Sequence, residues 1–347
     1  MVAIGSQPDF VPQSGCEPIA SFGKELSPRA MLLGFFMDAT MSVIERLSTE
    51  LEKPENEVIL FLSDAPKKYK VFTIPKRTSG HRVIAQPSKE LKRYQRIFLE
   101  FQDLPIHKAA MAYRKGFSIK DNAILHKKNR YFLNLDLESF FNSITSDLFW
   151  NVWSSIIELP SKNDRVALEK LLFWCPSKRS GGRLVLSVGA PSSPLVSNFF
   201  MYKFDCVIHE WCLSNKIVYT RYADDLTFST NQKKILFSVP DFIKNNLSSM
   251  FGDAIRINNK KTRFSSMAHN RHVTGVTINN VGEISLGRER KRYIKHLIHQ
   301  YDLVKLDDDT LGHLRGLLSF AQHIEPLFVK SLAEKYSQDL LVRIIEG

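Results

Sequence analysis

The sequence predicts an α+β protein, because strand-like and helix-like patterns alternate along most of its length. Apolar and polar residues alternate in residues 217–230 and again in residues 131–136, as they do in strands with two unlike faces. Between and after these runs, apolar residues recur at spacings of three and four, which is typical of amphipathic helices. The chain therefore combines short strands with longer helices.

Composition limits the classes of partner. A chain of 347 residues with 44% hydrophobic and 24% charged content is long enough for two or three packed subdomains. Lysine and arginine exceed aspartate and glutamate by 12, which predicts a polyanionic partner, either nucleic acid or a membrane surface. No apolar run approaches the roughly 20 residues of a spanning helix, and the N-terminus lacks a signal-peptide pattern. We therefore expect no membrane partner and a cytoplasmic location, with the four cysteines as reduced thiols.

The first third of the chain contains little recognisable chemistry. Residues 1–28 predict a loosely ordered lead-in and residues 29–51 a helix. Residues 67–87 predict a hairpin with cations on both strands, which is commonly a solvated edge protected against aggregation. Residues 88–104 predict a helix with a basic face, either solvated or placed along backbone phosphates.

Two adjacent carboxylates mark the middle of residues 217–230. The alternation breaks at Ala223-Asp224-Asp225, which predicts a tight turn between two strands. Like charges this close raise each other's pKa, and a divalent metal would remove that cost. Ordinary turn chemistry also favours aspartate, so the pair alone leaves both interpretations open.

A third carboxylate, Asp136, ends the strand predicted for residues 131–136. Leu133 and Leu135 face one side of that strand, whereas Asn134 and Asp136 face the other. Alone, Asp136 could be the N-cap of a following helix. Together with the acidic turn it has the composition of a two-metal site, in which ions about 3.5–4 Å apart stabilise a phosphoryl displacement. Hard oxygen ligands favour Mg²⁺, with Mn²⁺ as the alternative.

The motif Tyr222-Ala223-Asp224-Asp225, with Asp136 upstream, resembles the palm of reverse transcriptases and in particular of the bacterial retron type. The resemblance covers about residues 67–320 and implies a right-hand polymerase with fingers, palm and thumb. The implied division is an N-terminal region at 1–66, fingers at 67–130, a palm at 131–285 that includes finger-side helices at 147–175, and a thumb at 286–347. It implies that Asp136, Asp224 and Asp225 are the catalytic metal ligands.

The same resemblance implies roles around the incoming deoxynucleotide. The IPK run, the glycine turn and Arg-x-Ile resemble the family's fingers hairpin, which places Lys76 and Arg82 on the triphosphate with Arg77 as a helper. Phe141 would select dNTPs by colliding with a ribose 2′-hydroxyl, although two aromatics at a helix start are also normal core residues. Lys261 matches a lysine near the triphosphate, but a solvated lysine has the same sequence signature.

Residues 188–194 resemble the family's QGxxxSP element, in which Gly189 lies close to the nucleotide. This chain has Val188 in place of the glutamine, so an amide contact is missing. Ser192 or Ser193 could cap the long apolar helix predicted for residues 195–213.

Two short patterns resemble marks of the retron type and are expected to approach nucleic acid. One is NAxxH, in which Asn122 and His126 share a helix face, although His126 could equally be a hydrogen-bonded structural histidine. The other is VTG, with Thr274 in a strand predicted for residues 272–279. A basic helix from residue 288 is the natural thumb, with Arg288, Arg292 and Lys295 as phosphate contacts, although charge runs are usually solvated faces.

The implied activity is RNA-directed DNA synthesis on a cognate structured noncoding RNA. The resemblance further implies priming from an RNA 2′-hydroxyl, a branched RNA–DNA product (msDNA), and antiphage defence with an effector or toxin protein and a host ribonuclease H as partners. The alternatives are another bacterial defence reverse transcriptase with a different priming mode, or an RNA-binding scaffold that does not polymerise.

Overall fold

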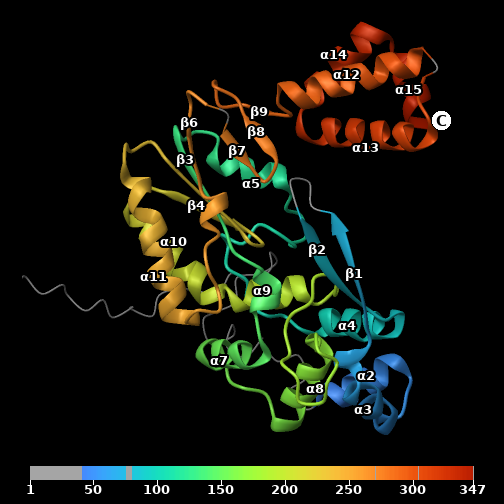
Figure 1. The fold of residues 1–347 in the computed structure, drawn as a ribbon, viewed down its shortest axis with the longest axis vertical. Coiled ribbons are helices and arrows are strands. Elements are labelled where there is room, and N and C mark those ends of the chain that lie inside the picture. The colour runs from blue at the N-terminus through green and yellow to red at the C-terminus, as the bar shows by residue number, and fades with distance from the viewer. Residues whose placement is uncertain (1–40, 76–79, 270, 304, 347) are drawn as a thin grey trace, which may run out of the picture.

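The computed structural model describes residues 41–75, 80–269, 271–303 and 305–346, and it confirms the α+β class (Figure 1). The predicted lead-in at 1–28, the first part of the helix predicted from residue 29, and Lys76 and Arg77 lie outside the described residues. Within the described ranges, none of the helices has the length and apolar character needed to cross a bilayer.

The central sheet is antiparallel, and its strands are β4 (Val218–Tyr222), β5 (Asp225–Thr230), β3 (Tyr131–Asp136) and β6 (Arg263–Ser266), in that spatial order. Leu133 and Leu135 point from β3 into the large core, as their alternation predicts. Phe132, on the opposite face of β3, packs in a second core. Helices α10 (Tyr202–Ser214) and α11 (Val239–Phe251) run alongside the sheet (Figure 1).

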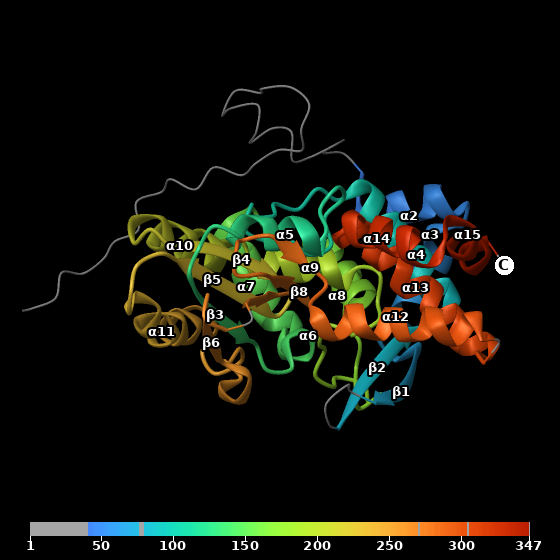
Figure 2. The same ribbon diagram turned by 90° about the horizontal axis from the view of Figure 1, so that it is seen from above.

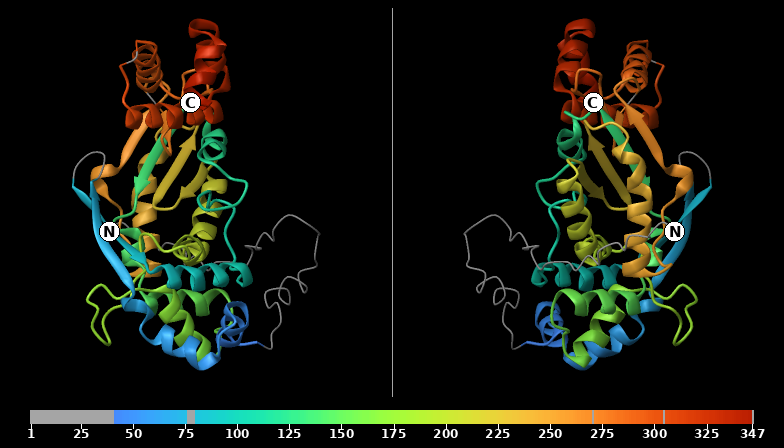
Figure 3. Two further views of the ribbon diagram at one scale, coloured as in Figure 1. Left: turned by 90° about the vertical axis from the view of Figure 1, so that its right-hand side faces the viewer. Right: turned by 90° about the vertical axis from the view of Figure 1, so that its left-hand side faces the viewer.

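The predicted basic hairpin consists of β1 (Tyr69–Pro75) and β2 (His81–Pro87), paired from Tyr69↔Pro87 to Pro75↔His81. It projects from the body beside α4 (Lys89–Phe101) (Figure 3). The helices around its foot belong to the large core. They are α2 (Val43–Leu51), α3 (Glu55–Ser63), the short 3₁₀ helix η1 (Ala65–Lys67), α7 (Ser146–Ile156) and α8 (Lys162–Leu172).

A three-stranded sheet, β7 (Arg271–Val273), β8 (Val276–Ile278) and β9 (Ile284–Ser285), leads into the C-terminal helices. These helices are α12 (Arg288–Asp302), α13 (Asp308–Ile324), α14 (Pro326–Tyr336) and α15 (Gln338–Glu346). They lie on the same side of the central sheet as the hairpin (Figures 1 and 2). The small sheet and the helices share the second core, so a palm–thumb boundary at residue 285 would divide one hydrophobic cluster.

Three predicted elements differ from the structure. The helix predicted for residues 195–213 is two helices, α9 (Ser193–Phe200) and α10, separated at Met201. Neither Ser192 nor Ser193 caps α9, because both hydroxyls are buried without a hydrogen-bond partner. The sequence of residues 255–264 predicts one strand with a basic turn, but in the structure these residues contain the 3₁₀ helix η3 (Asn259–Lys261), and β6 begins only at Arg263.

The strand predicted for residues 272–279 is instead the hairpin β7–β8. Thr274 and Gly275 form its turn with φ values of 48° and 81°, so the backbone reverses at the VTG triplet. Glycine favours that left-handed region, and this local preference outweighs the alternation of the flanking residues. Short helices complete the described elements: α5 (Ile119–His126), α6 (Phe140–Ser143) and the 3₁₀ helix η2 (Ile235–Ser238).

Candidate active site

The acidic turn forms as predicted between β4 and β5. Tyr222 pairs with Asp225, which leaves Ala223 and Asp224 as the two turn residues. Ala223 has φ 57°, a left-handed conformation that such tight hairpin turns require. The turn therefore presents two carboxylates at one end of the central sheet.

Asp136 joins this turn through strand pairing. Asp136 lies directly opposite Asp225 in the β3–β5 register, and the Leu137 amide donates to the Asp224 carbonyl at 3.0 Å. Directly paired residues have their Cβ atoms about 5 Å apart. Folding therefore brings the three carboxylates, which are far apart in sequence, to one place.

The three carboxylates influence one another electrostatically. Burial, together with the negative charges of Asp224 and Asp136, raises the pKa of Asp225 to about 7. Burial, and to a smaller extent the negative charge of Asp136, also raises the pKa of Asp224. Asp225 keeps an exposed surface, so water moderates the effect. Burial is the larger cause of both rises and repulsion between carboxylates the smaller one, and a cation bound among the three side chains would offset both.

Asn258 and Lys261 hold the Asp136 carboxylate in place. The Lys261 ammonium lies 2.7 Å from Asp136 Oδ2, and the Asn258 side chain donates to Oδ1 at 3.2 Å. The backbone N–H of Asn258 also donates to the backbone carbonyl of Asp136 at 2.7 Å. Both carboxylate oxygens are therefore fixed from one short segment, and sequence reasoning had not singled out Asn258.

The donor set suits a divalent cation. Among the described residues, no three His, Cys, Asp or Glu side chains are already gathered as a metal-ligand group. However, strand pairing brings three carboxylates to one end of the sheet, and one of them, Asp136, already pairs with the Lys261 ammonium at 2.7 Å. Oxygen ligands of this kind match Mg²⁺ or Mn²⁺.

Replacing Asn258 by alanine is expected to weaken Mn²⁺ binding by roughly 10-fold to 100-fold, as is typical when a residue that orients a metal ligand is lost. The reason is that Asp136 Oδ1 loses its hydrogen-bond donor. Electron paramagnetic resonance of Mn²⁺ measures this without any turnover. Asn246→Ala is the matched control, because its amide donates only to the Phe242 carbonyl within α11. Unchanged Mn²⁺ affinity in the Asn258 variant would show that Asn258 does not position Asp136.

A buried ion pair lies directly behind the acidic turn. Arg221 on β4 is fully buried and donates from Nε and Nη2 to Asp205 on α10, at 2.9 and 2.6 Å. The Tyr219 hydroxyl donates to the same carboxylate at 2.7 Å, and Arg221 Nη1 donates to the Ala223 carbonyl at 3.1 Å. Arg221 therefore connects helix α10 to the turn that carries Asp224.

Comparisons with known proteins identify the family to which this chain belongs. Residues 74–278 match the family model described as reverse transcriptase (RNA-dependent DNA polymerase). The retron Ec83 reverse transcriptase of Escherichia coli is 46% identical over 301 residues, which cover 86% of this chain and 96% of that protein. The chain is a reverse transcriptase of the bacterial retron type.

A second retron relative agrees with this assignment. The retron Ec86 reverse transcriptase of Escherichia coli is 31% identical over 312 residues, which cover 87% of this chain and 91% of that protein. Among solved structures, a telomerase from Candida albicans in complex with a telomeric RNA fragment is 13% identical with a TM-score of 0.42, covering 80% of this chain and 61% of that one. The reverse transcriptase fold and an RNA-directed DNA polymerase activity follow from the family match.

Strand β2 of the basic hairpin carries Arg82, which is exposed. Burial raises the pKa of Asp224 and Asp225, and the positive charge of Arg82 offsets a small part of that rise. The Val188 carbonyl accepts from the Ala85 amide at 3.1 Å. A Cβ on Gly189 would lie 3.3 Å from Ala85 O and Ile84 Cγ2, and its φ of 122° also favours glycine. Gly189 therefore lies against the hairpin.

The two phenylalanines after β3 differ in burial. Phe140 is a core residue, 2% exposed, whereas Phe141 is half-buried and packs against it with ring centroids 5.4 Å apart. The core interpretation therefore holds for Phe140. Contact between Phe141 and the nucleotide sugar stays a prediction, as does contact between Lys261 and the triphosphate.

Asn122 and His126, the residues of the first retron pattern, lie on α5 and are both 0% exposed. Contact of this pattern with nucleic acid stays a prediction. His126 lies between the hydroxyls of Thr220 and Ser229, at 2.8 and 2.7 Å. Asn122 Nδ2 lies 3.4 Å from Thr274 Oγ1, so the two marks contact each other. For His126, the structural-histidine alternative holds.

Acid is expected to destabilise the protein through His126. Burial lowers its pKa to about 3, against 6.5 for an ordinary histidine. Between pH 6.5 and 3 the unfolded chain binds a proton at His126 that the folded chain does not. The contribution of neutral His126 to the free energy of unfolding is therefore fully present above pH 6.5 and is lost as the pH decreases toward 3. The loss is at most about 1.4 kcal/mol per pH unit.

Urea unfolding at pH 7.5, 6.5 and 5.5 measures this slope for the wild type and for His126→Gln. His107, whose pKa burial lowers to about 4, adds a slope of the same sign, so the variant should retain part of the pH dependence. Equal slopes for the two proteins would contradict the assignment to His126.

The basic side chains of helix α12 differ in their exposure to solvent. Arg288 and Arg292 are exposed, whereas Lys295 is half-buried with Nζ 5.8 Å from the centre of the Phe328 ring. Lys291 pairs with Glu325 inside the helical cluster. Phosphate contact by Arg288, Arg292 and Lys295 stays a prediction, and Arg288 and Arg292 are the two that face solvent.

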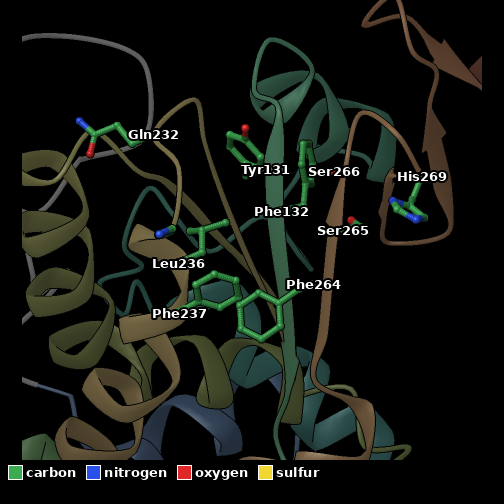
Figure 4. Close-up of a pocket in the computed structure, with 10 residues that line it drawn as sticks. Tyr131, Phe132, Gln232, Leu236, Phe237, Phe264, Ser265, Ser266 and His269 are labelled. Carbon is green, nitrogen blue, oxygen red and sulfur yellow. The ribbon is translucent and has the colours of Figure 1, made fainter.

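A pocket of about 240 Å³ lies at the other end of the central sheet, where β3 begins (Figure 4). Phe237 and Phe264 line it side by side, with ring centroids 5.1 Å apart. Tyr131 also lines it, about 17 Å along β3 from Asp136 at 3.3 Å per residue. The pocket is therefore separate from the carboxylate site.

Proposed function

We propose that this reverse transcriptase copies part of a structured noncoding RNA into DNA, starting from a 2′-hydroxyl of that RNA and leaving a branched RNA–DNA product. The observation that carries the proposal is the convergence of Asp136, Asp224 and Asp225 at one end of the central sheet. The similarity to retron reverse transcriptases supports a proposal of the retron type. A role in antiphage defence, with an effector protein and a host ribonuclease H as partners, belongs to the same proposal.

In this proposal Asp136, Asp224 and Asp225 hold Mg²⁺, which when bound lowers the pKa of the attacking hydroxyl and stabilises charge on the phosphate oxygens. Asn258 keeps the Asp136 carboxylate in its orientation. Arg82 and Lys76 bind the triphosphate, and Phe141 excludes nucleotides with a 2′-hydroxyl. Arg221 fixes the turn that carries Asp224.

The priming step can be tested on the product. RNA and DNA that copurify with the protein are deproteinised, divided, and treated with a 2′,5′-debranching enzyme or with buffer alone. The proposal expects the DNA to lose its RNA end only after debranching. DNA that stays attached to the protein, or that carries a free 5′ end before treatment, would contradict 2′-hydroxyl priming and favour a reverse transcriptase with another priming mode.

A further inference from the structure

A strongly basic groove lies at the foot of the fingers hairpin, between the start of β1, the end of β2 and the first turns of α4. Its volume is about 680 Å³. Six of its ten lining residues carry a positive charge: Lys67, Lys68, Lys70, Lys89, Lys92 and Arg96.

Little negative charge balances this groove. Lys67 and Lys68 share one carboxylate, Asp64, at 3.5 and 3.6 Å. In the described part of the chain, the other four cations have no carboxylate within ion-pair distance. The N-terminus of α4, which Ser88 caps, opens beside them and adds a favourable dipole for an anion. The groove therefore suits a ligand with several negative charges.

Among the described residues that line the groove, none offers an exposed ring on which a base could stack. Tyr69 is the one aromatic residue of that set, and it is 4% exposed with its hydroxyl accepting from Gln95. Proteins that bind single strands combine cations with exposed aromatic rings, whereas double-stranded RNA is bound mainly through phosphates and shape. The chemistry of the groove therefore favours the backbone of a paired strand.

The groove is separate from the carboxylate site. Tyr69 and Pro87 pair at the foot of the hairpin, and Ile74 and Arg82 pair five residues further along, about 17 Å away at 3.3 Å per residue. The Cys175 amide donates to the Pro66 carbonyl at 2.9 Å, which places the basic turn at residues 177–183 next to η1. Positive charge therefore continues beyond the groove on the side away from Arg82.

We propose that this groove binds the phosphate backbone of a base-paired stem in the RNA that the enzyme copies. The inference rests on the proposed function and deepens it, because it assigns a holding site for the RNA outside the site of synthesis. An RNA anchored there keeps its position while the strand being copied moves through the carboxylate site.

The test compares two triple variants with the same change in charge. Lys70→Gln/Lys89→Gln/Lys92→Gln removes three groove cations, and Lys162→Gln/Lys203→Gln/Lys244→Gln removes three exposed lysines from α8, α10 and α11. Fluorescence anisotropy measures binding of an RNA hairpin of about 16 base pairs, a length that double-stranded RNA-binding domains span. Binding of an unpaired RNA of equal length is measured in parallel.

The groove variant is expected to bind the hairpin on the order of 100-fold more weakly at 150 mM salt, with a salt slope smaller by roughly 2 to 3, since each phosphate contact contributes about 0.7–0.9. The control variant should bind like the wild type. Equal affinity of all three proteins for the hairpin, equal loss in both variants, or a loss confined to unpaired RNA would each overturn the proposal.

Extension of a DNA primer on an unstructured RNA template separates this proposal from the proposed function. The groove variant should extend such a primer as the wild type does, which also shows that it is folded. A wild type that does not extend the primer, but whose hairpin binding depends on the groove, would overturn the proposed function and leave the groove assignment standing. Normal extension with groove-independent hairpin binding would overturn the groove assignment alone.

Discussion

Replacing both Asp224 and Asp225 by asparagine is expected to reduce DNA synthesis by at least roughly 10³-fold. A metal site of this kind supplies several kcal/mol of transition-state stabilisation, and each 1.36 kcal/mol is a factor of ten in rate. Asparagine keeps the size of both side chains and their place in the β4–β5 turn, so the fold and the binding of RNA should remain. Primer extension with Mg²⁺ measures synthesis, and anisotropy with labelled RNA measures binding.

Asp241→Asn with Asp253→Asn is the matched control. It also removes two carboxylates, but from the exposed surface at α11 and the turn that follows it. The control should synthesise DNA normally. Retained synthesis in the Asp224/Asp225 variant would refute the carboxylate site, whatever the family resemblance, and would favour a site elsewhere in the protein.

Replacing Arg221 by methionine is expected to destabilise the protein by about 3–5 kcal/mol, because removal of one partner leaves a buried and unpaired charge. Here the remaining charge is Asp205, which is 0% exposed. Urea unfolding measures the loss. A change below about 1 kcal/mol, the usual value of an exposed ion pair, would show that water reaches this pair.

A second variant separates stability from the positioning of the turn. Arg221→Met with Asp205→Leu removes both charges, and replacing a buried ion pair by apolar residues is often nearly neutral for stability. The double variant should therefore recover much of the stability. It should not recover synthesis, because the bond from Arg221 to the Ala223 carbonyl is absent in both variants. Full recovery of synthesis would show that Arg221 acts through stability alone.

The parts of the site that sequence could predict are those with a local signal. Two adjacent aspartates that break a strand pattern predict a turn, and Asp136 stands out because it ends an apolar strand. Their meeting depends on the pairing of β3 with β5, which the family resemblance implied and the alternation of residues did not.

Asn258 and Arg221 had no comparable signal. Asn258 contacts a carboxylate 122 positions away, so its role exists only after folding. Arg221 lies on the same strand face as Tyr219, two residues away, but the spacing does not say whether a cation there is buried, and its burial depends on Asp205 of α10. Pairings of this kind are tertiary, and a pattern of hydrophobicity does not contain them.

Where the observed secondary structure differs from the predicted one, the local sequence signal was absent or was outweighed by another. The sequence between Leu195 and Leu213 has neither proline nor glycine, so nothing in it marks the break at Met201. In contrast, Gly275 did mark the turn between β7 and β8, but alternation over eight residues suggested a single strand. Asn122 and His126 share a helix face, and burial of that face could not be distinguished from exposure in a segment this short.

Strand β3 has a hydrophobic core on each side, with Leu133 and Leu135 in one and Phe132 in the other. The Asn134 side chain also donates to the His272 carbonyl on β7, which ties β3 to the thumb-side sheet. The C-terminal helices are therefore not structurally independent of the central sheet. A chimera that replaced only residues 286–347 would place foreign side chains in the core that contains Phe132, so new helices would require matching changes on the strand that ends in Asp136.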